Sequence, residues 1–385
     1  MRSSLFGRLL GTLWLAAAPL AAQQPATPRP VPAATEHAVE ARYEAAADSA
    51  RAILRRLQAA EAIPGLSAAV LVDGRIVWSE GLGFADLENR VPATALTRFR
   101  IASISKPVTA AAVGLLVEQG RLDLDEPVQR YVPDYPGQRW PITARQLAGH
   151  TAGVRHYRGD EMLSARRYPD VRSALAIFER DSLLFEPGTK YNYSTYGFNL
   201  LSAVVEGAAG EPFLAYMERA VFAPLGLRSI GAEHGDSLIE WRARFYDRGA
   251  DGRVRNAPYV DNSNKWAGGG FVSNAEDLAR FGWAHVGGGL LKPETVTLLT
   301  TSQRLRSGEP TGYGIGWSVG ADSASGRRWW GHTGGATGGR SVLVVLPDEH
   351  VVVAALANLG QAPMSIELAR RIAEGFVRAR AAGAR

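Results

Sequence analysis

The chain has 385 residues, of which 46% are hydrophobic, so it is long enough to bury a sizeable core. It contains no cysteine, which excludes disulfide bonds and thiolate metal sites. Lysine and arginine number 43 against 38 acidic residues, but the basic residues are scattered among acids rather than gathered in runs, which argues against a nucleic-acid partner.

The first 35 residues have the composition of an export signal followed by a linker. Arginines precede an apolar run at residues 9–20 and small residues follow it, so the pattern predicts a secretory signal peptide over residues 1–22. The apolar run is too short to predict a membrane span, and we expect no stable span after cleavage. Proline-rich residues 23–35 predict a flexible linker. We therefore expect a periplasmic or secreted protein whose folded domain covers residues 36–385.

The domain begins with patterns for one helix and one hairpin. Apolar residues recur at helical spacing over residues 36–62, and Pro64-Gly65 ends that pattern. Strands at 66–72 and 75–79 flank the turn residues Asp73-Gly74. Beyond this hairpin the patterns become mostly helical.

The C-terminal part predicts three strands and a closing helix. Residues 327–332, 340–346 and 351–358 are rich in β-branched and aromatic side chains, and helical spacing follows at 364–381. The chain therefore predicts an α+β fold, with an antiparallel sheet built from both chain ends and flanked by helices, and a mostly helical subdomain inserted at about 107–225. Active sites commonly lie in the cleft between two such parts.

The run Ser103-Ile104-Ser105-Lys106 places a lysine three residues after a serine, at a predicted junction of strand and helix. Positions i and i+3 share one helix face, so the Lys106 amine can reach the Ser103 hydroxyl. Only four of the 43 basic residues are lysines, and lysine, unlike arginine, can lose its proton when desolvated. A single such motif also arises by chance on a solvated helix, but the pairing indicates acyl transfer through serine.

Two further motifs follow in chain order. Tyr193-Ser194-Thr195 comes after a Pro-Gly turn, and His332-Thr333-Gly334-Gly335 comes at the end of a predicted strand. With the Ser-x-x-Lys motif, they resemble the signature of serine β-lactamases and penicillin-binding proteins: Ser-x-x-Lys, then Tyr-x-Asn or its equivalent, then Lys-Thr-Gly or His-Thr-Gly. This resemblance implies the serine β-lactamase/DD-peptidase-like fold.

The resemblance narrows to the LACTB-type branch of the class C β-lactamase-like hydrolases. It rests on segments 131–136, 138–153, 150–157 and 262–271, and it covers roughly residues 40 to 380. The resemblance implies that Ser103 is the acylated nucleophile and Lys106 the amine that takes its proton. Tyr193, preferred over the neighbouring tyrosine at position 191, matches a phenolate-like base that later protonates the leaving group.

The same resemblance assigns the substrate-binding residues and exposes two departures. The backbone N–H groups of the nucleophile and of Gly335 match the oxyanion hole, and Thr333 with Gly334 match a strand edge that binds substrate through its main chain. Thr195 stands where the family usually has asparagine, and His332 stands where many penicillin-recognising enzymes have lysine. Both departures argue against efficient β-lactamase activity, although Arg340 is a cation that lies near in sequence.

Other polar residues have simpler explanations. His150 and His156, beside a Thr-Ala-Gly turn, are expected to fix a loop, and the glycines at 268–270 are expected to permit close backbone approach rather than to bind phosphate. Lys265 and Trp266 either line the cleft or pack. No histidine pair has a metal-binding spacing, so we expect neither a metal nor another cofactor.

These patterns favour an enzyme, an exported serine hydrolase of the peptidase or esterase type that forms an acyl-enzyme at Ser103 on a peptide or ester. Two alternatives remain. One is a D-Ala-D-Ala carboxypeptidase or β-lactamase of the same fold, and the other is a non-catalytic scaffold or binding protein that retains it. The expected partner is a small-molecule or peptide substrate, and the sequence leaves a homo-oligomer open.

Overall fold

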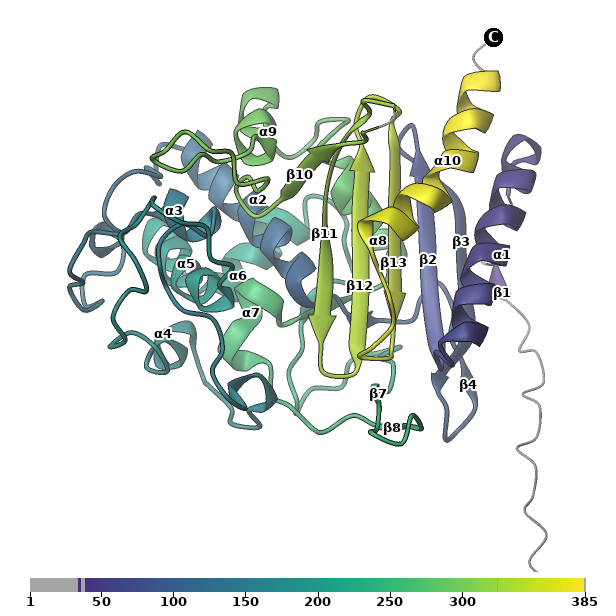
Figure 1. Ribbon diagram of the computed structural model, residues 1–385, viewed down its shortest axis with the longest axis horizontal. Coiled ribbons are helices and arrows are strands. Elements are labelled where there is room, and N and C mark those ends of the chain that lie inside the picture. The colour runs from purple at the N-terminus through teal and green to yellow at the C-terminus, as the bar shows by residue number, and fades with distance from the viewer. Residues whose placement is uncertain (1–33, 36–38, 324, 384–385) are drawn as a thin grey trace, which may run out of the picture. The chain divides into compact units, whose positions relative to one another are not determined.

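An eight-stranded antiparallel sheet lies at the centre of the computed structural model, which describes residues 34–35, 39–323 and 325–383. Its strands lie in the order β1-β3-β2-β13-β12-β11-β10, and β4 pairs with β3 (Figure 1). The strands are β1 (Ala34–Thr35), β2 (Gly65–Val72), β3 (Arg75–Asp86), β4 (Val91–Pro92), β10 (Ser318–Ala321), β11 (Arg328–Ala336), β12 (Gly339–Leu346) and β13 (Val351–Ala357). The predicted signal peptide and most of the predicted linker lie outside the described residues.

A strand from the N-terminal part of the chain pairs with one from the C-terminal part in the middle of this sheet. β2 pairs antiparallel with β13, so that Val72 lies opposite Val351 and Leu66 lies opposite Ala357. The expectation of an α+β fold with an antiparallel sheet built from both chain ends is therefore confirmed.

Helices cover both faces of the sheet. On β2, Ala68 and Val70 join the core beneath α1 and α10, whereas Ala69 and Leu71 point to the opposite face and join the core that contains α8. Because both faces are buried, the strands read as continuous hydrophobic runs rather than as alternating ones. Figure 1 shows α1 and α10 side by side along one face of the sheet. These helices are α1 (Glu44–Ala60), α8 (Ala275–Trp283) and α10 (Ile366–Gly383).

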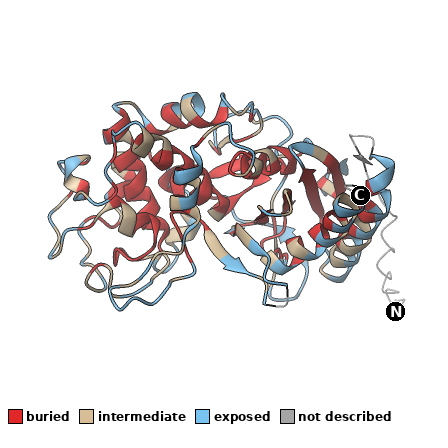
Figure 2. Cartoon of the chain, turned by 90° about the horizontal axis from the view of Figure 1, so that it is seen from above, coloured by how far each residue is buried: buried red, intermediate tan, exposed pale blue. Residues whose placement is uncertain are grey.

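A second, mainly helical part adjoins the sheet, and α2, α5 and α7 pack against one another inside it. Figure 2 shows buried residues running through the middle of this part as well as through the sheet. Its helices are α2 (Ser105–Glu118), α3 (Ala144–Ala148), α4 (Val171–Leu175), α5 (Thr195–Ala209), α6 (Phe213–Met217), α7 (Trp266–Gly269) and α9 (Pro293–Thr300). The structure places α2 to α6 close to the range predicted for a helical insertion.

Short elements connect the two parts. The 3₁₀ helices are η1 (Ala41–Tyr43), η2 (Ala102–Ile104), η3 (Val128–Arg130), η4 (Glu161–Leu163) and η6 (Ser263–Lys265), and η5 (Glu218–Phe222) is a π-helical turn. Two small sheets consist of β5 (Phe99–Arg100), β9 (Phe271–Ser273) and β6 (Gly231–Ala232), and of β7 (Tyr246–Arg248) and β8 (Val254–Asn256). No helix in the part of the chain that the structure describes is long and apolar enough to cross a membrane.

One element differs from the sequence expectation in a way that matters for the site. β11 extends to Ala336, so the His332–Gly335 motif lies within the strand and not at its end. Glycine has low strand propensity, but here the ladder with β12 continues to the pair Ala336 and Gly339. Pairing with β12 therefore outweighs local propensity.

The packing of α10 on the sheet generates a test of stability. Phe376 is fully buried, and its ring lies 6.0 Å from that of Tyr43 and 6.2 Å from that of Trp78, measured between centroids. We expect Phe376→Ala to lower the free energy of unfolding by about 3–5 kcal/mol, because it removes buried surface and leaves a cavity. The control, Arg378→Ala on the exposed side of the same helix, is expected to change it by less than about 0.5 kcal/mol in urea unfolding. Equal effects of the two variants would contradict this account of the core.

Candidate active site

The nucleophile candidate lies at a sharp turn between a strand and a helix. β5 ends at Arg100, and Ala102 then adopts a left-handed backbone with φ of 48° before Ser103 continues through η2 into α2. Few non-glycine residues adopt this conformation, and it is costly unless the surrounding structure holds it. The turn is held by the sheet, because Ser341 on β12 donates a hydrogen bond to the carbonyl oxygen of Ile101 at 2.7 Å.

The amine of Lys106 is the hub of the site. It is fully buried, and Nζ lies within hydrogen-bond distance of Ser103 Oγ at 3.1 Å, of Thr195 Oγ1 at 3.2 Å and of the carbonyl oxygen of Gly268 at 2.6 Å. Burial disfavours the charged form and holds the pKa of Lys106 well below its usual value. The residue is therefore suited to act as a neutral amine, which accepts protons, rather than as an ammonium.

Tyr193 lies over the same amine. Lys106 Nζ is 4.7 Å from the centroid of the Tyr193 ring, and the phenol hydrogen-bonds to Ser103. Burial raises the pKa of Tyr193, so the phenol keeps its proton in the resting protein. This environment does not fit the expectation of a phenolate-like base. The rival Tyr191 is 38% exposed and does not line the pocket that contains Ser103.

Two histidines fix the backbone of the Tyr-Ser-Thr motif. His150 Nδ1 accepts a hydrogen bond from the Ser194 amide, and His156 Nδ1 accepts one from the Thr195 amide, each at 3.1 Å. The His150 ring also packs on that of Tyr193, with centroids 4.3 Å apart. Burial lowers the pKa of His156 to about 4, which keeps its ring neutral and able to accept. Both histidines therefore position the motif, as their place beside the Thr-Ala-Gly turn predicts.

The motif also starts a helix. Ser194 is the N-cap of α5, because its Oγ accepts the amide hydrogen of Gly197 at 2.9 Å and donates to the carbonyl oxygen of Arg155 at 2.7 Å. Thr195 is the first residue of α5 and projects toward Lys106. The N-cap thus fixes the position of the Thr195 hydroxyl, which accepts a hydrogen bond from Lys106.

β11 supplies the third motif. Gly334 has no room for a side chain, since a Cβ there would lie 2.3 Å from the carbonyl oxygen of Ile101 and 2.1 Å from Ser341 Oγ. β10 pairs only with residues Arg328 to Gly331 of β11, so Thr333 and Gly335 lie beyond the stretch that β10 covers. That geometry leaves an exposed strand edge beside Ser103, where an extended substrate can add hydrogen bonds.

His332 is a neutral structural residue in this arrangement. It is buried, its Nε2 lies 2.9 Å from the Tyr313 hydroxyl, and its Nδ1 lies 2.5 Å from the carbonyl oxygen of Thr333. Burial is the main cause that lowers its pKa to about 3. The motif therefore lacks the fixed positive charge that a lysine provides at this position.

The glycine run brings backbone against the amine, as expected from the sequence. A Cβ at Gly268 would lie 2.6 Å from the Thr195 methyl group, so only glycine lets the carbonyl of α7 reach Lys106. Thr109 on α2 donates to the carbonyl oxygen of Ala267 at 3.0 Å and fixes α7 in place.

A pocket of about 80 Å³ lies where the three motifs and the glycine run meet. Ser103, Tyr193, Thr195 and Gly335 line it together, whereas Trp266 packs in the core. The residues that line the pocket are Ser103, His156, Tyr157, Met162, Tyr193, Thr195, Lys265, Gly268, Gly269, Gly335 and Ala336. Sequence reasoning did not find Tyr157 and Met162 and left Lys265 undecided, because they come from irregular segments whose path no pattern indicates.

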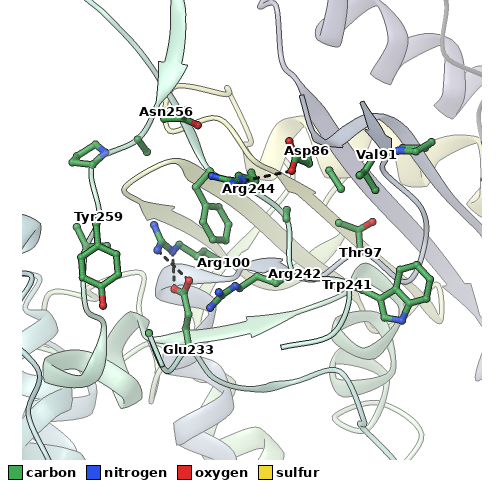
Figure 3. A pocket seen from close by; sticks show the side chains of 18 residues that line it. Asp86, Val91, Thr97, Arg100, Glu233, Trp241, Arg242, Arg244, Asn256 and Tyr259 are labelled. Atoms are coloured by element: carbon green, nitrogen blue, oxygen red, sulfur yellow. Dashed lines mark hydrogen bonds and ion pairs between the residues drawn. The ribbon is translucent and has the colours of Figure 1, made fainter. Parts of the chain in front are cut away.

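A larger hollow of about 720 Å³ lies elsewhere on the chain (Figure 3). Its floor is a buried ion pair in which Arg100 donates to both carboxylate oxygens of Glu233, at 2.6 and 3.0 Å. Arg100 also donates to the carbonyl oxygen of Thr337 at 2.6 Å. This hollow contains none of the three motifs, but its ion pair anchors β5 just before the nucleophile turn.

Comparisons with known proteins agree with this geometry. The family model described as "Beta-lactamase" matches residues 50–375. The chain is similar to the human "Serine beta-lactamase-like protein LACTB, mitochondrial", with 34% identity over 400 residues, covering 80% of this chain and 73% of that protein. It is also similar to "Penicillin-binding protein 4*" of Bacillus subtilis (strain 168), with 26% identity, covering 74% of this chain and 66% of that protein.

Solved structures show the same fold. A D-stereospecific amidohydrolase from Streptomyces sp. superimposes with a TM-score of 0.72 and 26% identity, covering 85% of this chain and 97% of the other. With the family model spanning most of the sequence and the LACTB relative covering four fifths of it, this chain belongs to the beta-lactamase family.

Proposed function

We propose that the protein is an exported serine hydrolase that forms an acyl-enzyme at Ser103 and hydrolyses a peptide or ester. The observation that carries the proposal is the Lys106 amine, which is fully buried and lies 3.1 Å from Ser103 Oγ. Burial holds the pKa of this amine well below its usual value. A neutral amine at hydrogen-bond distance from a serine is one arrangement that activates the serine for nucleophilic catalysis.

The contacts suggest how the proton moves. With the amine neutral, its two N–H groups serve Gly268 and Thr195, and its lone pair faces the Ser103 hydroxyl. Ser103 Oγ then bonds to the substrate carbonyl carbon while its proton passes to Lys106, and the carbonyl oxygen takes the negative charge. The backbone N–H groups of Ser103 and Gly335 are the proposed donors to that oxygen.

Collapse of this intermediate completes acylation. The bond to the leaving group breaks, and the leaving group takes a proton from the Tyr193 hydroxyl, which the Lys106 ammonium restores. Water then attacks the acyl group by the reverse path, releases the acid and regenerates Ser103. Because burial keeps Tyr193 protonated, we assign it to proton donation and assign the base to Lys106.

The alternatives receive less support. Recognition of a β-lactam or of a D-Ala terminus commonly uses a fixed positive charge on the third motif, and His332 is neutral because it is buried. A non-catalytic scaffold has no need for a desolvated lysine beside a serine, because burying the amine costs free energy and such groups are concentrated at functional sites. Export stays a prediction from residues 1–22, and a mature N-terminus at Gln23, found by mass spectrometry, would support it.

Covalent labelling tests the nucleophile. We expect a fluorophosphonate probe to add one adduct to the wild-type protein, and we expect Ser103→Ala to reduce labelling and ester turnover by at least about a thousandfold, because the attacking oxygen is gone. Intact mass and initial rates provide the measurements. An adduct of equal yield on Ser103→Ala would reject the assignment.

The tyrosine assignment has a matched control. Tyr193→Phe keeps the ring against His150 but removes the proton donor, so turnover is expected to fall by about a hundredfold or more. Tyr191→Phe, which changes the partly exposed neighbouring tyrosine, is expected to stay within about threefold. Equal losses of steady-state turnover in the two variants would contradict the assignment of Tyr193 as the proton donor.

The protonation state of Lys106 predicts a pH dependence. Because burial lowers its pKa, the amine becomes neutral at a lower pH than ordinary lysine, and the acylation rate should rise with pH and level off well below the usual pKa of 10.5. Labelling with an uncharged probe, quenched at set times over a range of pH, measures the acylation rate. Lys106→Arg should be inactive across the range, since a guanidinium does not deprotonate. A rise centred near 10.5 would contradict the model of a desolvated base.

A further inference from the structure

A buried ion pair lies directly beside the nucleophile turn. Arg100 and Glu233 are 6% and 5% exposed, and the Arg100 guanidinium donates to both carboxylate oxygens of Glu233, at 2.6 and 3.0 Å (Figure 3). A pair with two parallel hydrogen bonds fixes the angle between its partners as well as their distance. Arg100 is the last residue of β5, three residues before Ser103, so whatever holds Arg100 also holds the start of the turn.

The same guanidinium reaches the third motif. Its remaining amino group, Nη1, donates to the carbonyl oxygen of Thr337 at 2.6 Å. Thr337 lies in the turn between β11 and β12, two residues after Gly335, the proposed second donor of the oxyanion hole. The backbone at Gly339 also packs on Arg100, since a Cβ there would lie 3.2 Å from Arg100 Cβ. Arg100 therefore connects the strand that leads to the nucleophile with the turn that follows Gly335.

Glu233 extends this connection to a third segment. It follows β6, and its own amide donates to the carbonyl oxygen of Gly270 at 2.9 Å. Its carboxylate also accepts from the side chain of Asn262, the residue before η6. η6 leads into α7, whose Gly268 carbonyl oxygen lies 2.6 Å from the Lys106 amine. The ion pair is thus bonded to segments that lead to the nucleophile, to the oxyanion donor and to a partner of the base.

Stability alone is a poor explanation for this pair. Removing two charges from water costs about as much free energy as their attraction returns, so apolar side chains could hold β5 equally well. They could not specify the direction of the Thr337 carbonyl, which the guanidinium does. The guanidinium carbon of Arg100 lies 4.0 Å from the centroid of the Phe245 ring, and stacking on an aromatic face fixes the plane of the fork. The geometry therefore favours placement of backbone as the role of the pair.

The two proposed oxyanion donors belong to different segments. The Ser103 amide lies in the turn after β5, and the Gly335 amide lies in β11. Donors act on a developing oxyanion over a narrow range of positions, and loss of one donor slows the reaction by about a hundredfold to a thousandfold. The sheet reaches the turn through Ser341, which donates to the Ile101 carbonyl oxygen, and the guanidinium adds a second connection at the β11–β12 turn.

We propose that the Arg100–Glu233 pair positions the oxyanion hole by setting the separation between the Ser103 and Gly335 amides. This inference rests on the proposed serine hydrolase function and adds two positioning residues that act through the backbone. Weakening the pair lets the β11–β12 turn shift relative to the nucleophile, so the transition state loses hydrogen bonds while the proton-transfer groups stay in place. A displacement of about 1 Å at such a site costs up to about a hundredfold in rate.

Replacing the carbonyl oxygen of a substrate by sulfur tests the oxyanion hole directly. A p-nitrophenyl ester and the matching thionoester differ only in that atom and release the same p-nitrophenol, which is followed by absorbance against a no-enzyme blank. Sulfur is larger and is a weaker acceptor, so a well-placed hole prefers oxygen. We expect the wild-type protein to favour the ester in kcat/KM by about tenfold or more beyond the intrinsic preference, which hydrolysis by hydroxide gives.

Glu233→Gln keeps the shape of the side chain and removes its charge. We expect kcat/KM for the ester to fall by about tenfold or more, and the ester-to-thionoester ratio to fall toward the intrinsic one. Rates are expressed per active serine, counted from complete fluorophosphonate labelling of Ser103, so that a misfolded fraction does not contribute. Arg100→Lys keeps a positive charge but has a single nitrogen in place of the planar fork, and we expect it to lower the ratio in the same way.

A second buried pair in the same chain is the matched control. Arg51 Nε on α1 lies 2.9 and 2.8 Å from the two carboxylate oxygens of Glu80 on β3, and Glu80 is 1% exposed. In the sheet, β3 is separated from β11 by β2, β13 and β12. We expect Glu80→Gln to lower the midpoint of thermal unfolding, as Glu233→Gln does, but to leave the ester-to-thionoester ratio at its wild-type value.

Removing both charges separates positioning from stability. The double variant Arg100→Met with Glu233→Met leaves neither member of the pair charged, and buried pairs replaced in this way often keep or gain stability. We therefore expect its unfolding midpoint to lie above that of Glu233→Gln, while the ester-to-thionoester ratio stays low because the contact to Thr337 is still missing. If Glu233→Gln does not fold, the double variant and Arg100→Lys provide the same comparison.

The outcomes separate this inference from the proposed function. A wild-type ratio no higher than the intrinsic one, an unchanged ratio in Glu233→Gln, an equal loss in Glu80→Gln, or a recovered ratio in the double variant would overturn the positioning role and leave the serine hydrolase intact. If fluorophosphonate does not label Ser103 in the wild-type protein, the proposed function fails and the inference fails with it.

Discussion

The burial of the Lys106 amine is the constraint on which the helical part and the site both depend. Its three hydrogen-bond partners come from three segments: the Ser103 turn, the first residue of α5 and the carbonyl of Gly268 on α7. An amine removed from water is costly unless such acceptors replace its solvation. The same closure of α2, α5 and α7 that completes this core also lowers the affinity of the amine for a proton. Folding therefore lowers the pKa of the amine in the same step that builds the core.

The sheet holds the turn at the nucleophile rigid. Ser341 on β12 holds the Ile101 carbonyl, and Gly334 lies so close to the same carbonyl that no side chain fits between them. The left-handed residue Ala102 is therefore clamped between a sheet buried on both faces and a helix that begins three residues later. A strained turn of this kind keeps its geometry because everything around it is already packed.

Much of this was predictable from the sequence, and the failures have physical causes. Hydrophobic runs and turn residues predicted the sheet, and the spacing of Ser103 to Lys106 follows from helix geometry alone. Local pattern could not place Lys265, because its position depends on contacts between irregular segments distant in sequence. It also could not show that Tyr193 stays protonated, since a pKa shift of this kind arises from burial, which only the fold determines.

The shortness of β10 has a wider meaning. It has four residues and stops pairing with β11 at Gly331, just before the His-Thr-Gly motif begins. An insertion that lengthened β10 along its partner would satisfy the main chain of β11 and cover the exposed edge with the protein's own backbone. Such a descendant would keep its core and every side chain of the three motifs, and yet would no longer offer the edge of β11 to a ligand. In this architecture, access to the edge of β11 depends on the length of β10 as much as on the residues of the motif.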